Sequence, residues 1–395
     1  MKPFILTFFL SLIIGTTLAH GGVIMVNNGQ SIQNAVNAAN SGDEILLPGG
    51  VFAEDVVVNG KKLSLRSFAN TTEVRSISFI NAPGSSTIQN LQLDDLNATN
   101  SNLFVKRATI GNNAHIWGGK FQILQSTITE KLTCKASVSH ILYNDIRYAE
   151  IEGNSTITGN HFNGRELTGI GIDLTGPQTF AEIRNNRVHD YLTNSSVDLN
   201  DSVIGIRVRN NARANIINNL IYDCRKGSSG GIENRVGMGV FVESSAETNI
   251  LGNIFWGCFV KNGTGTNPGN SFIWAPASGT LVEYNLYWRS NHYQPAQLVK
   301  GGVIDRNTVG PIDHMPINTD GTLKTNSPAI NAGPPDPRFN DLDGSRNDIG
   351  MFGGHNYIPN GKTTDKPIVL GLDAAPTFVP IGGTVTIEST GATVK

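Results

Sequence analysis

A short pattern recurs along the middle of this chain: an apolar residue, two variable residues, an asparagine, one variable residue and a second apolar residue. The seven clearest copies contain Asn144, Asn160, Asn186, Asn219, Asn253, Asn285 and Asn307. Weaker copies upstream carry another residue in the asparagine position, namely Leu63, Ile77, Leu91, Ala108 and Ser126. A unit this short cannot bury its apolar face alone, so the copies must stack to form a continuous core. The repeat therefore predicts a solenoid.

Each copy shows strand-length alternation and no helix-length pattern, so the predicted solenoid is a stack of parallel strands about 4.8 Å apart. Composition agrees, because 44 glycines and 43 asparagines among 395 residues both favour left-handed turns. We expect each repeated asparagine to lie at a tight turn, in a left-handed conformation, and to bond to the asparagine of the next coil. The net charge of −2, without a long basic run, gives no electrostatic support for nucleic-acid binding.

The two ends of the chain fall outside the repeat. Residues 1–19 contain Lys2, an apolar run and small residues at Thr17 and Ala19, which predicts a secretory signal peptide and a secreted or otherwise extracytoplasmic protein. That run is too short to span a bilayer comfortably, and no later segment is apolar enough to do so. Residues 356–366 are expected to form a linker, and residues 367–395 a short C-terminal β segment.

A short helix is expected to close the first coil. In Ser31–Ala39, Ser31 is a good N-cap, and the apolar residues from Ile32 to Ala39 fall on one helical face. Three segments resemble right-handed parallel β-helix proteins of the pectate-lyase-like superfamily. They are SIQNAVNAANSGDEILLPGGVFAEDVVV, which begins with this helix, and the later runs NSPAINAG and NDLDGSRNDIGMFGG. The resemblance implies an all-β, right-handed parallel β-helix over residues 22–355. It leaves the activity open, because lyases, hydrolases, epimerases and non-catalytic surface proteins share this fold.

The coils lengthen after Asn160, and the additional residues form three expected loops, 189–202, 223–237 and 257–270. Strands in these coils align so that two rows face outward: Asp173, Arg207 and Phe241, then Thr175, Arg209 and Glu243. We expect Asp173 beside Arg207, and Arg209 beside Glu243. The arrangement is typical either of charge pairing on a solvated sheet or of a groove for an acidic sugar. Arginine binds the carboxylate of such a sugar well.

The resemblance implies that the outward strand face and its flanking loops form a substrate cleft, as in the superfamily's lyases, where a basic residue removes the C5 proton of a uronate. An arginine or a cation then stabilises the carboxylate. Arginine stays protonated, so the loop histidine and lysines are better candidates for the base. The candidate catalytic residues are Arg207, Arg209, Lys226 and His189, and the candidate substrate-binding residues are Asp173, Phe241, Glu243, Trp274 and Lys261.

Three other functions stay open beside β-elimination of an acidic polysaccharide by a monomeric lyase. One is a non-catalytic, adhesin-like protein that binds glycans, and another is a purely structural spacer. The third is a glycoside hydrolase, which needs two carboxylates, whereas Asp173 and Glu243 are expected about 10 Å apart. Asp198, Asp201 and Asp223 are either solvated loop acids or a Ca²⁺ site. The acidic run at 341–348 is expected to form a closing turn rather than a cation loop.

The cysteines offer one structural prediction. Cys224 and Cys258 each lie five residues beyond a repeated asparagine, so they are expected to stack on neighbouring coils. One strand spacing lies within the Cα separation that a disulfide permits, and export would favour oxidation. The alternatives are a disulfide or two stacked buried thiols. Cys134 has no such partner and is expected in the core.

Overall fold

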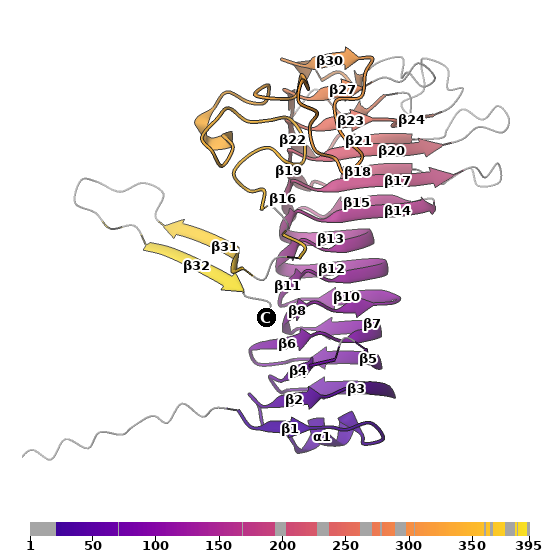
Figure 1. The fold of residues 1–395 in the computed structure, drawn as a ribbon, viewed down its shortest axis with the longest axis vertical. Coiled ribbons are helices and arrows are strands. Elements are labelled where there is room, and N and C mark those ends of the chain that lie inside the picture. The colour runs from indigo at the N-terminus through magenta and orange to yellow at the C-terminus, as the bar shows by residue number, and fades with distance from the viewer. Residues whose placement is uncertain are drawn as a thin grey trace, which may run out of the picture.

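The chain forms a parallel β-helix with a short N-terminal helix, which confirms the predicted fold class (Figure 1). The structure is a computed structural model that describes residues 21–69, 71–167, 169–193, 203–226, 237–260, 271–276, 279–288, 298–303, 305–358, 361–363, 366–375, 384 and 386–392. Each coil contributes strands to three parallel sheets, and each strand pairs with the equivalent strand of the next coil.

Sheet 1 contains the strands that follow the repeated asparagines: β9 (Thr109–Ile110), β14 (His161–Leu167), β17 (Arg187–Thr193), β20 (Leu220–Lys226), β23 (Ile254–Trp256), β24 (Phe259–Val260), β27 (Leu286–Trp288) and β30 (Val309–Ile312). Sheet 2 comes next in each coil: β10 (Asn113–Trp117), β15 (Ile170–Thr175), β18 (Val203–Arg209), β21 (Gly237–Val242), β25 (Ile273–Trp274) and β28 (Val299–Lys300).

Sheet 3 completes each coil with β1 (Val23–Met25), β2 (Glu44–Leu47), β4 (Ser64–Ser67), β6 (Ser85–Gln89), β8 (Asn102–Lys106), β11 (Lys120–Leu124), β16 (Phe180–Arg184), β19 (Arg213–Ile217), β22 (Glu247–Leu251), β26 (Thr280–Glu283) and β29 (Asp305–Arg306). Longer strands cross the corners between sheets. They are β3 (Gly50–Asn59), β5 (Thr72–Ile80) and β7 (Gln92–Thr99) across sheets 1 and 2, and β12 (Thr127–Leu142) and β13 (Asp145–Thr158) across all three.

Six of the repeated asparagines form a continuous buried ladder, as predicted. Asn219 is typical: its Oδ1 accepts from the backbone N–H and the Nδ2 of Asn186, both at 3.0 Å, and its Nδ2 donates to Asn253 Oδ1 at 3.0 Å. The ladder runs from Asn144 to Asn285. Each amide therefore joins two coils and also satisfies a backbone N–H at a turn where no strand partner is available.

Two details of the ladder differ from the prediction. The left-handed residue is the one before each ladder position, as in Asn185 (φ 55°) and Asn218 (φ 54°), so the ladder asparagines do not occupy that conformation. Asn307 (φ 53°) takes this preceding position in the last coil. The register, in which Glu283 pairs with Arg306 and Leu286 with Val309, puts Thr308 rather than Asn307 on the ladder.

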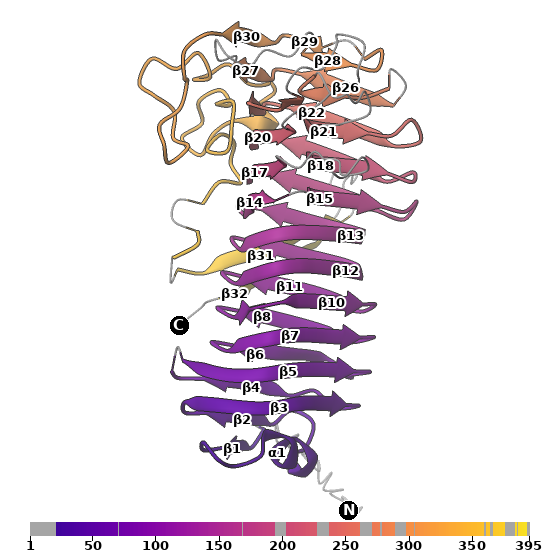
Figure 2. The same ribbon diagram turned by 90° about the vertical axis from the view of Figure 1, so that its right-hand side faces the viewer.

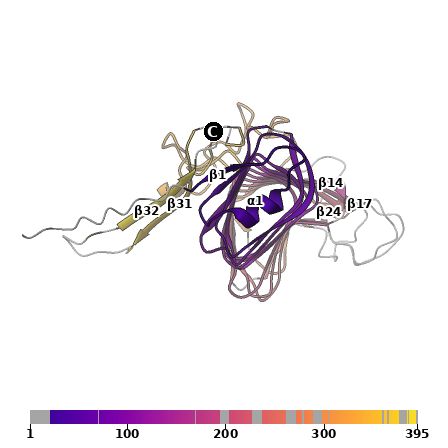
Figure 3. The same cartoon turned by 90° about the horizontal axis from the view of Figure 1, so that it is seen from below.

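The capping helix α1 (Ile32–Ala38) lies across the first coil (Figure 3). Ser31 is its N-cap, and Ile32 and Val36 are buried. Glu54 of β3 accepts hydrogen bonds from Ile32 N at 2.9 Å and from Gln33 N at 3.2 Å. Burial alone would raise the pKa of Glu54, but these bonds and one from the Ser31 hydroxyl outweigh it and lower that pKa. The helix start therefore binds a carboxylate from the second coil, as its dipole favours.

After β30 the chain turns back along the outside of the solenoid. We call residues 313–358 the return segment, which includes the short 3₁₀ helix η1 (Pro337–Phe339) and runs beside sheets 1 and 3 (Figures 1 and 2). Beyond it, β31 (Ile368–Ala375) and β32 (Thr386–Ala392) pair as an antiparallel hairpin. Within the described ranges, no helix has the length and apolar character needed to cross a bilayer.

Candidate functional site

The outward row predicted on sheet 2 exists and is longer than expected. The predicted register is confirmed, because Asp173 pairs with Arg207 and Arg207 with Phe241. The next pairings add Trp274 and then Lys300. The alternate residues, such as Ile172, Ile206 and Val240, are fully buried in the core. We call Asp173, Arg207, Phe241, Trp274 and Lys300 the sheet 2 row.

Asp173 is held by two arginines. Arg207 donates through Nε at 2.9 Å and Nη2 at 2.6 Å, and Arg209 donates through Nη2 at 3.0 Å. Burial alone would raise the pKa of the Asp173 carboxyl, but these bonds outweigh it and lower that pKa. Asp173 therefore stays ionised, which makes it unsuited to the general acid role in a hydrolase.

Arg209 departs from its predicted ion pair. Glu243 comes directly after β21, which pairs with the strand of Arg209, and its backbone N–H donates to Val208 O at 2.9 Å. The Arg209 guanidinium nevertheless turns to Asp173, and the Glu243 carboxylate accepts from the backbone N–H of Asn210 at 3.3 Å. Two guanidinium charges thus share one carboxylate. Asp173, together with Glu150 and Glu243, raises the pKa of Arg209, so the two arginines lie among several carboxylates.

Aromatic and basic side chains occupy the other end of the sheet 2 row. The rings of Phe241 and Trp274 stack with centroids 6.4 Å apart and planes 12° from parallel. Lys300 follows on the next strand, is 9% exposed, and has its pKa lowered by burial. Sequence reasoning missed Lys300, because the number of residues between β27 and β28 differs from that in the neighbouring coil and hides the register.

His189 lies on another sheet, away from the sheet 2 row. It belongs to a column of stacked rings on sheet 1, between His161 (centroids 4.7 Å apart) and Tyr222 (4.6 Å). Trp256 and Trp288 continue the column. His189 is 4% exposed, and its Nε2 is 2.5 Å from that of His161. Burial lowers its pKa, although Asp190 opposes the shift. The position gives His189 a packing role in the column.

Asp223 is the described member of the candidate metal cluster. It and Asp190 occupy equivalent left-handed positions on neighbouring strands, with φ of 52° and 57°. Burial raises the pKa of Asp223 to about 6, with Arg225 opposing the shift from 3.3 Å away. The close partner Asp190 has its pKa lowered by a hydrogen bond with His189. The Asp223 carboxyl therefore binds a proton at a higher pH than the adjacent Asp190 carboxyl does.

Other predicted residues fall outside the described part of the chain. Asp198, Asp201 and Lys261 lie there, and for Lys226, the last residue of β20, only the backbone is described. Within the described ranges, no group of three or more His, Cys, Asp or Glu side chains could hold a metal ion. Asp341 accepts from the backbone N–H of Asp348 at 3.1 Å and from that of Gly354, so this acidic run forms the expected closing turn.

The cysteines are stacked and buried, and the structure has them as free thiols rather than a disulfide. Cys224 and Cys258 lie on neighbouring coils, as predicted, because Tyr222 pairs with Trp256 and Arg225 with Phe259. The Cys258 thiol approaches Trp256 O at 3.4 Å, and the Cys224 thiol approaches Tyr222 O at 3.6 Å. The Cys258 thiol also approaches Ile221 O of the neighbouring strand at 3.8 Å, and it lies close enough to Cys224 to raise the pKa of that thiol. Cys134 is buried in the core, as expected.

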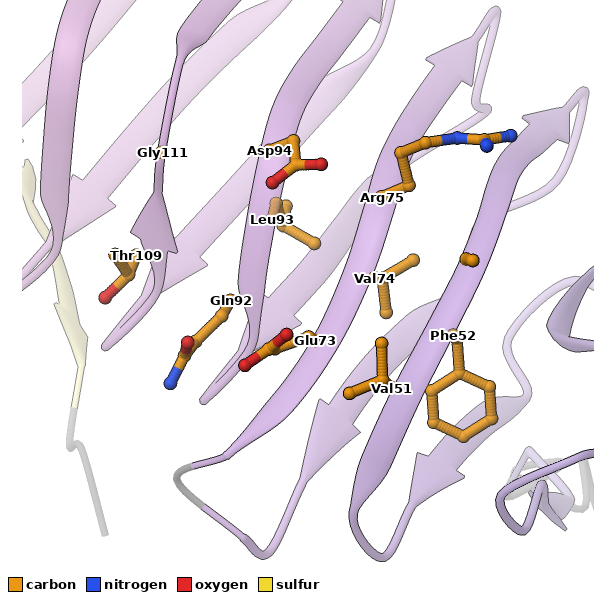
Figure 4. Close-up of a pocket in the computed structure, with 11 residues that line it drawn as sticks. Val51, Phe52, Glu73, Val74, Arg75, Gln92, Leu93, Asp94, Thr109 and Gly111 are labelled. Atoms are coloured by element: carbon orange, nitrogen blue, oxygen red, sulfur yellow. The ribbon is translucent and has the colours of Figure 1, made fainter.

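A groove of about 410 Å³ crosses the outer face of the first coils, where no site was predicted (Figure 4). Glu73, Gln92 and Thr109 follow one another in register along one side. Arg75 and Asp94 lie on the other side, and Arg75 pairs with Asp55 at 2.5 Å. With Arg75 neutralised, the carboxylates leave the groove acidic. An acidic glycan would therefore be repelled here.

Comparison with known proteins gives fold similarity alone. No protein-family model and no curated protein matches the chain. The crystal structure of pectate lyase Pel9A is 14% identical, with a TM-score of 0.41, and the match covers 85% of this chain and 97% of that one. The PL6 family alginate lyase AlyGC is 12% identical, with a TM-score of 0.43, and the match covers 85% of this chain and 59% of that one. At these values the matches support no inference about activity.

Proposed function

We propose that this protein binds an acidic polysaccharide along the sheet 2 row and cleaves it by β-elimination, outside the cytoplasm. The observation that carries the proposal is the register of Arg207, Phe241, Trp274 and Lys300 on successive strands. Strands about 4.8 Å apart place such side chains at intervals close to the length of one sugar unit. A glycan lying along the solenoid axis would meet a carboxylate-binding group, two stacking rings and a base in turn.

Each group has a chemical task in this proposal. Arg207 and Arg209 bind the carboxylate of a uronate unit three strand spacings from Lys300 and so fix the register of the polymer, because the reacting unit lies beside Lys300. Phe241 and Trp274 provide an apolar surface against which the sugar can pack. Lys300 is the proposed base, because burial lowers its pKa and so increases the fraction that is unprotonated at a given pH. No step is assigned to Ca²⁺, which enters the assay as a variable.

Glycan binding without cleavage is the second candidate. It is favoured by the hydrogen bonds from Arg207 and Arg209 to Asp173, which occupy the donors that a substrate carboxylate would use. In that case the sheet 2 row would bind glycan through its rings and basic side chains but would lack catalysis.

The test is incubation of the mature protein with polygalacturonate, alginate and chondroitin, with and without Ca²⁺. Cleavage by β-elimination yields an unsaturated product with ultraviolet absorbance. We expect Lys300→Met to abolish product while retaining binding, and Trp274→Ala to weaken binding. Leu281→Ala is the matched control, since Leu281 is an exposed side chain on sheet 3. Binding without product on every polymer would leave the second candidate, and absence of both would refute the proposal.

A further inference from the structure

A second pocket of about 450 Å³ lies between sheet 3 and the return segment, on a different sheet from the sheet 2 row. Its volume is in the range of small-molecule sites. One wall consists of Thr156 and Thr158 of β13 and Glu182 and Arg184 of β16. The other wall consists of Arg338, Phe339, His355 and Asn356 of the return segment. We call it the return-segment pocket.

Hydrogen bonds hold both walls of this pocket in place. Asn185, beside Arg184, donates from Nδ2 to Met351 O at 3.0 Å and to Gly353 O at 2.7 Å. Asn347 donates to Phe339 O at 2.7 Å. The Asn185 bonds attach the return segment to the solenoid, and the Asn347 bond holds Phe339 against the rest of the return segment. The cavity is therefore preformed, which lowers the entropy lost when a ligand binds.

The arginines are oriented by carboxylates yet keep donors for a ligand. Glu182 Oε2 accepts from Arg184 Nε at 2.8 Å, with Nη2 at 2.7 Å, and Asp336 Oδ2 accepts from Arg338 Nε at 2.9 Å and Nη2 at 2.6 Å. In both guanidinium groups, Nη1 has no partner among the described residues. A guanidinium has five N–H donors, so each arginine keeps one edge for another acceptor.

The remaining polar groups of the pocket suit a hydroxyl-rich ligand. The hydroxyls of Thr156 and Thr158 and the ring of His355 have no hydrogen-bond partner within the described part of the chain. Phe339 adds an apolar face between them. Glu182 and Asp336 balance the two arginine charges, so the pocket has no large positive excess. This balance favours a singly charged ligand over a multiply charged phosphate.

We propose that the return-segment pocket binds a sugar acid, either a uronate unit or a short acidic oligosaccharide. The guanidinium edges would bind its carboxylate, the threonine hydroxyls and His355 its hydroxyl groups, and Phe339 one face of its ring. The inference rests on the proposed function for the class of glycan alone. Its location is independent, because none of these residues belongs to the sheet 2 row.

The experiment is a titration of the mature protein with uronate trisaccharides, followed by calorimetry and by the NMR signal of the His355 ring, assigned with His355→Asn. We expect Arg338→Ala, whose side chain is 84% exposed, and Thr156→Val each to weaken the His355-reported binding by about tenfold. Arg306→Ala is the matched control, because it removes a charge from another exposed arginine, 62% exposed and outside the pocket. It should leave the binding unchanged.

The outcomes separate this inference from the proposed function. A His355 response that survives Trp274→Ala but is lost in Arg338→Ala supports the pocket as a separate site. Binding that Arg338→Ala and Thr156→Val leave unchanged, or the absence of any His355 response, overturns the inference. Equal displacement by inorganic phosphate overturns the assignment to a sugar. A His355 response, combined with unchanged polymer cleavage in Lys300→Met and unchanged polymer binding in Trp274→Ala, leaves the pocket standing and removes the proposed function.

Discussion

Replacing Asn219 by alanine tests whether the buried amide ladder stabilises the solenoid. The side chain is fully buried, and it takes part in five hydrogen bonds. Its Oδ1 accepts from Asn186 N and Nδ2, and its Nδ2 donates to Ile183 O, Ile217 O and Asn253 Oδ1. Alanine would leave the Asn186 backbone N–H without a partner in a site that excludes water. One such group costs about 1–3 kcal/mol.

The lost amide contacts and the cavity left by the shorter side chain increase that cost. We expect Asn219→Ala to lower the free energy of unfolding by about 3–5 kcal/mol. Asn249→Ala is the matched control. Asn249 also donates from Nδ2 to the asparagine of the adjacent coil, Asn215, at 2.8 Å, but on an exposed face. Water can replace that bond, so we expect a change of about 0.5 kcal/mol or less.

Urea unfolding measures the global effect, and hydrogen exchange of the backbone around Asn186 measures the local one. The second readout matters because repeat arrays can unfold in parts. Equal shifts of the urea midpoint in Asn219→Ala and Asn249→Ala would contradict the reasoning. So would unchanged exchange protection of the Asn186 N–H, since Asn219 Oδ1 accepts that hydrogen.

Three further predictions concern single groups. Burial raises the pKa of Asp223 from 3.8 to about 6, so the stability that this group contributes is complete below pH 3.8 and is lost as the pH rises through about 6. Asp223→Asn should therefore raise the melting temperature at about pH 8 but not at about pH 4. An equal change of the melting temperature at both pH values would contradict this pH dependence. Burial raises the pKa of Cys134 to about 12 and that of Cys224 well above its ordinary value. A thiol reagent should therefore label these cysteines only after the protein has unfolded. Rapid labelling of the native protein would contradict this prediction. Glu54→Ala should cost about 1–2 kcal/mol and increase hydrogen exchange in α1, whereas the exposed Glu73→Ala should change neither.

The fold could be predicted because the same short pattern occurs many times along the chain. Each asparagine of the ladder is flanked by apolar residues at fixed offsets, and strands with the same alternating pattern, such as those holding Asp173 and Arg207, can be aligned directly. The same logic failed at Lys300, because the numbers of residues that separate β25 and β28 from the strands before them are unequal. Once the spacing varies, the offset from the ladder no longer gives the register, and only the backbone hydrogen bonds do.

The stacked column on sheet 1 was readable but was not recognised. His189, Tyr222, Trp256 and Trp288 each lie three residues beyond a ladder asparagine, so a constant offset marked them. The constant offset indicates that these side chains face outward from sheet 1, but it does not indicate which part of the chain covers them. The return segment, which has no repeat, packs against these rings with residues such as Ile317 and Ile349. An unrepeated segment gives no positional signal, so its path depends on contacts that the pattern does not contain.

The asparagine doublets provide the link between repeat and return segment. In Asn185–Asn186 and Asn218–Asn219 the second residue belongs to the buried ladder, whereas the first is left-handed. The first residue of each doublet uses its amide to bind the return segment, Asn185 at Met351 O and Asn218 at Asp348 O. Lower on the same corner, Gln125 donates to Gly361 O at 2.8 Å. The turn conformation that winds the coils thus also positions amide donors along one corner, and these donors fix the chain that forms the outer wall of the return-segment pocket.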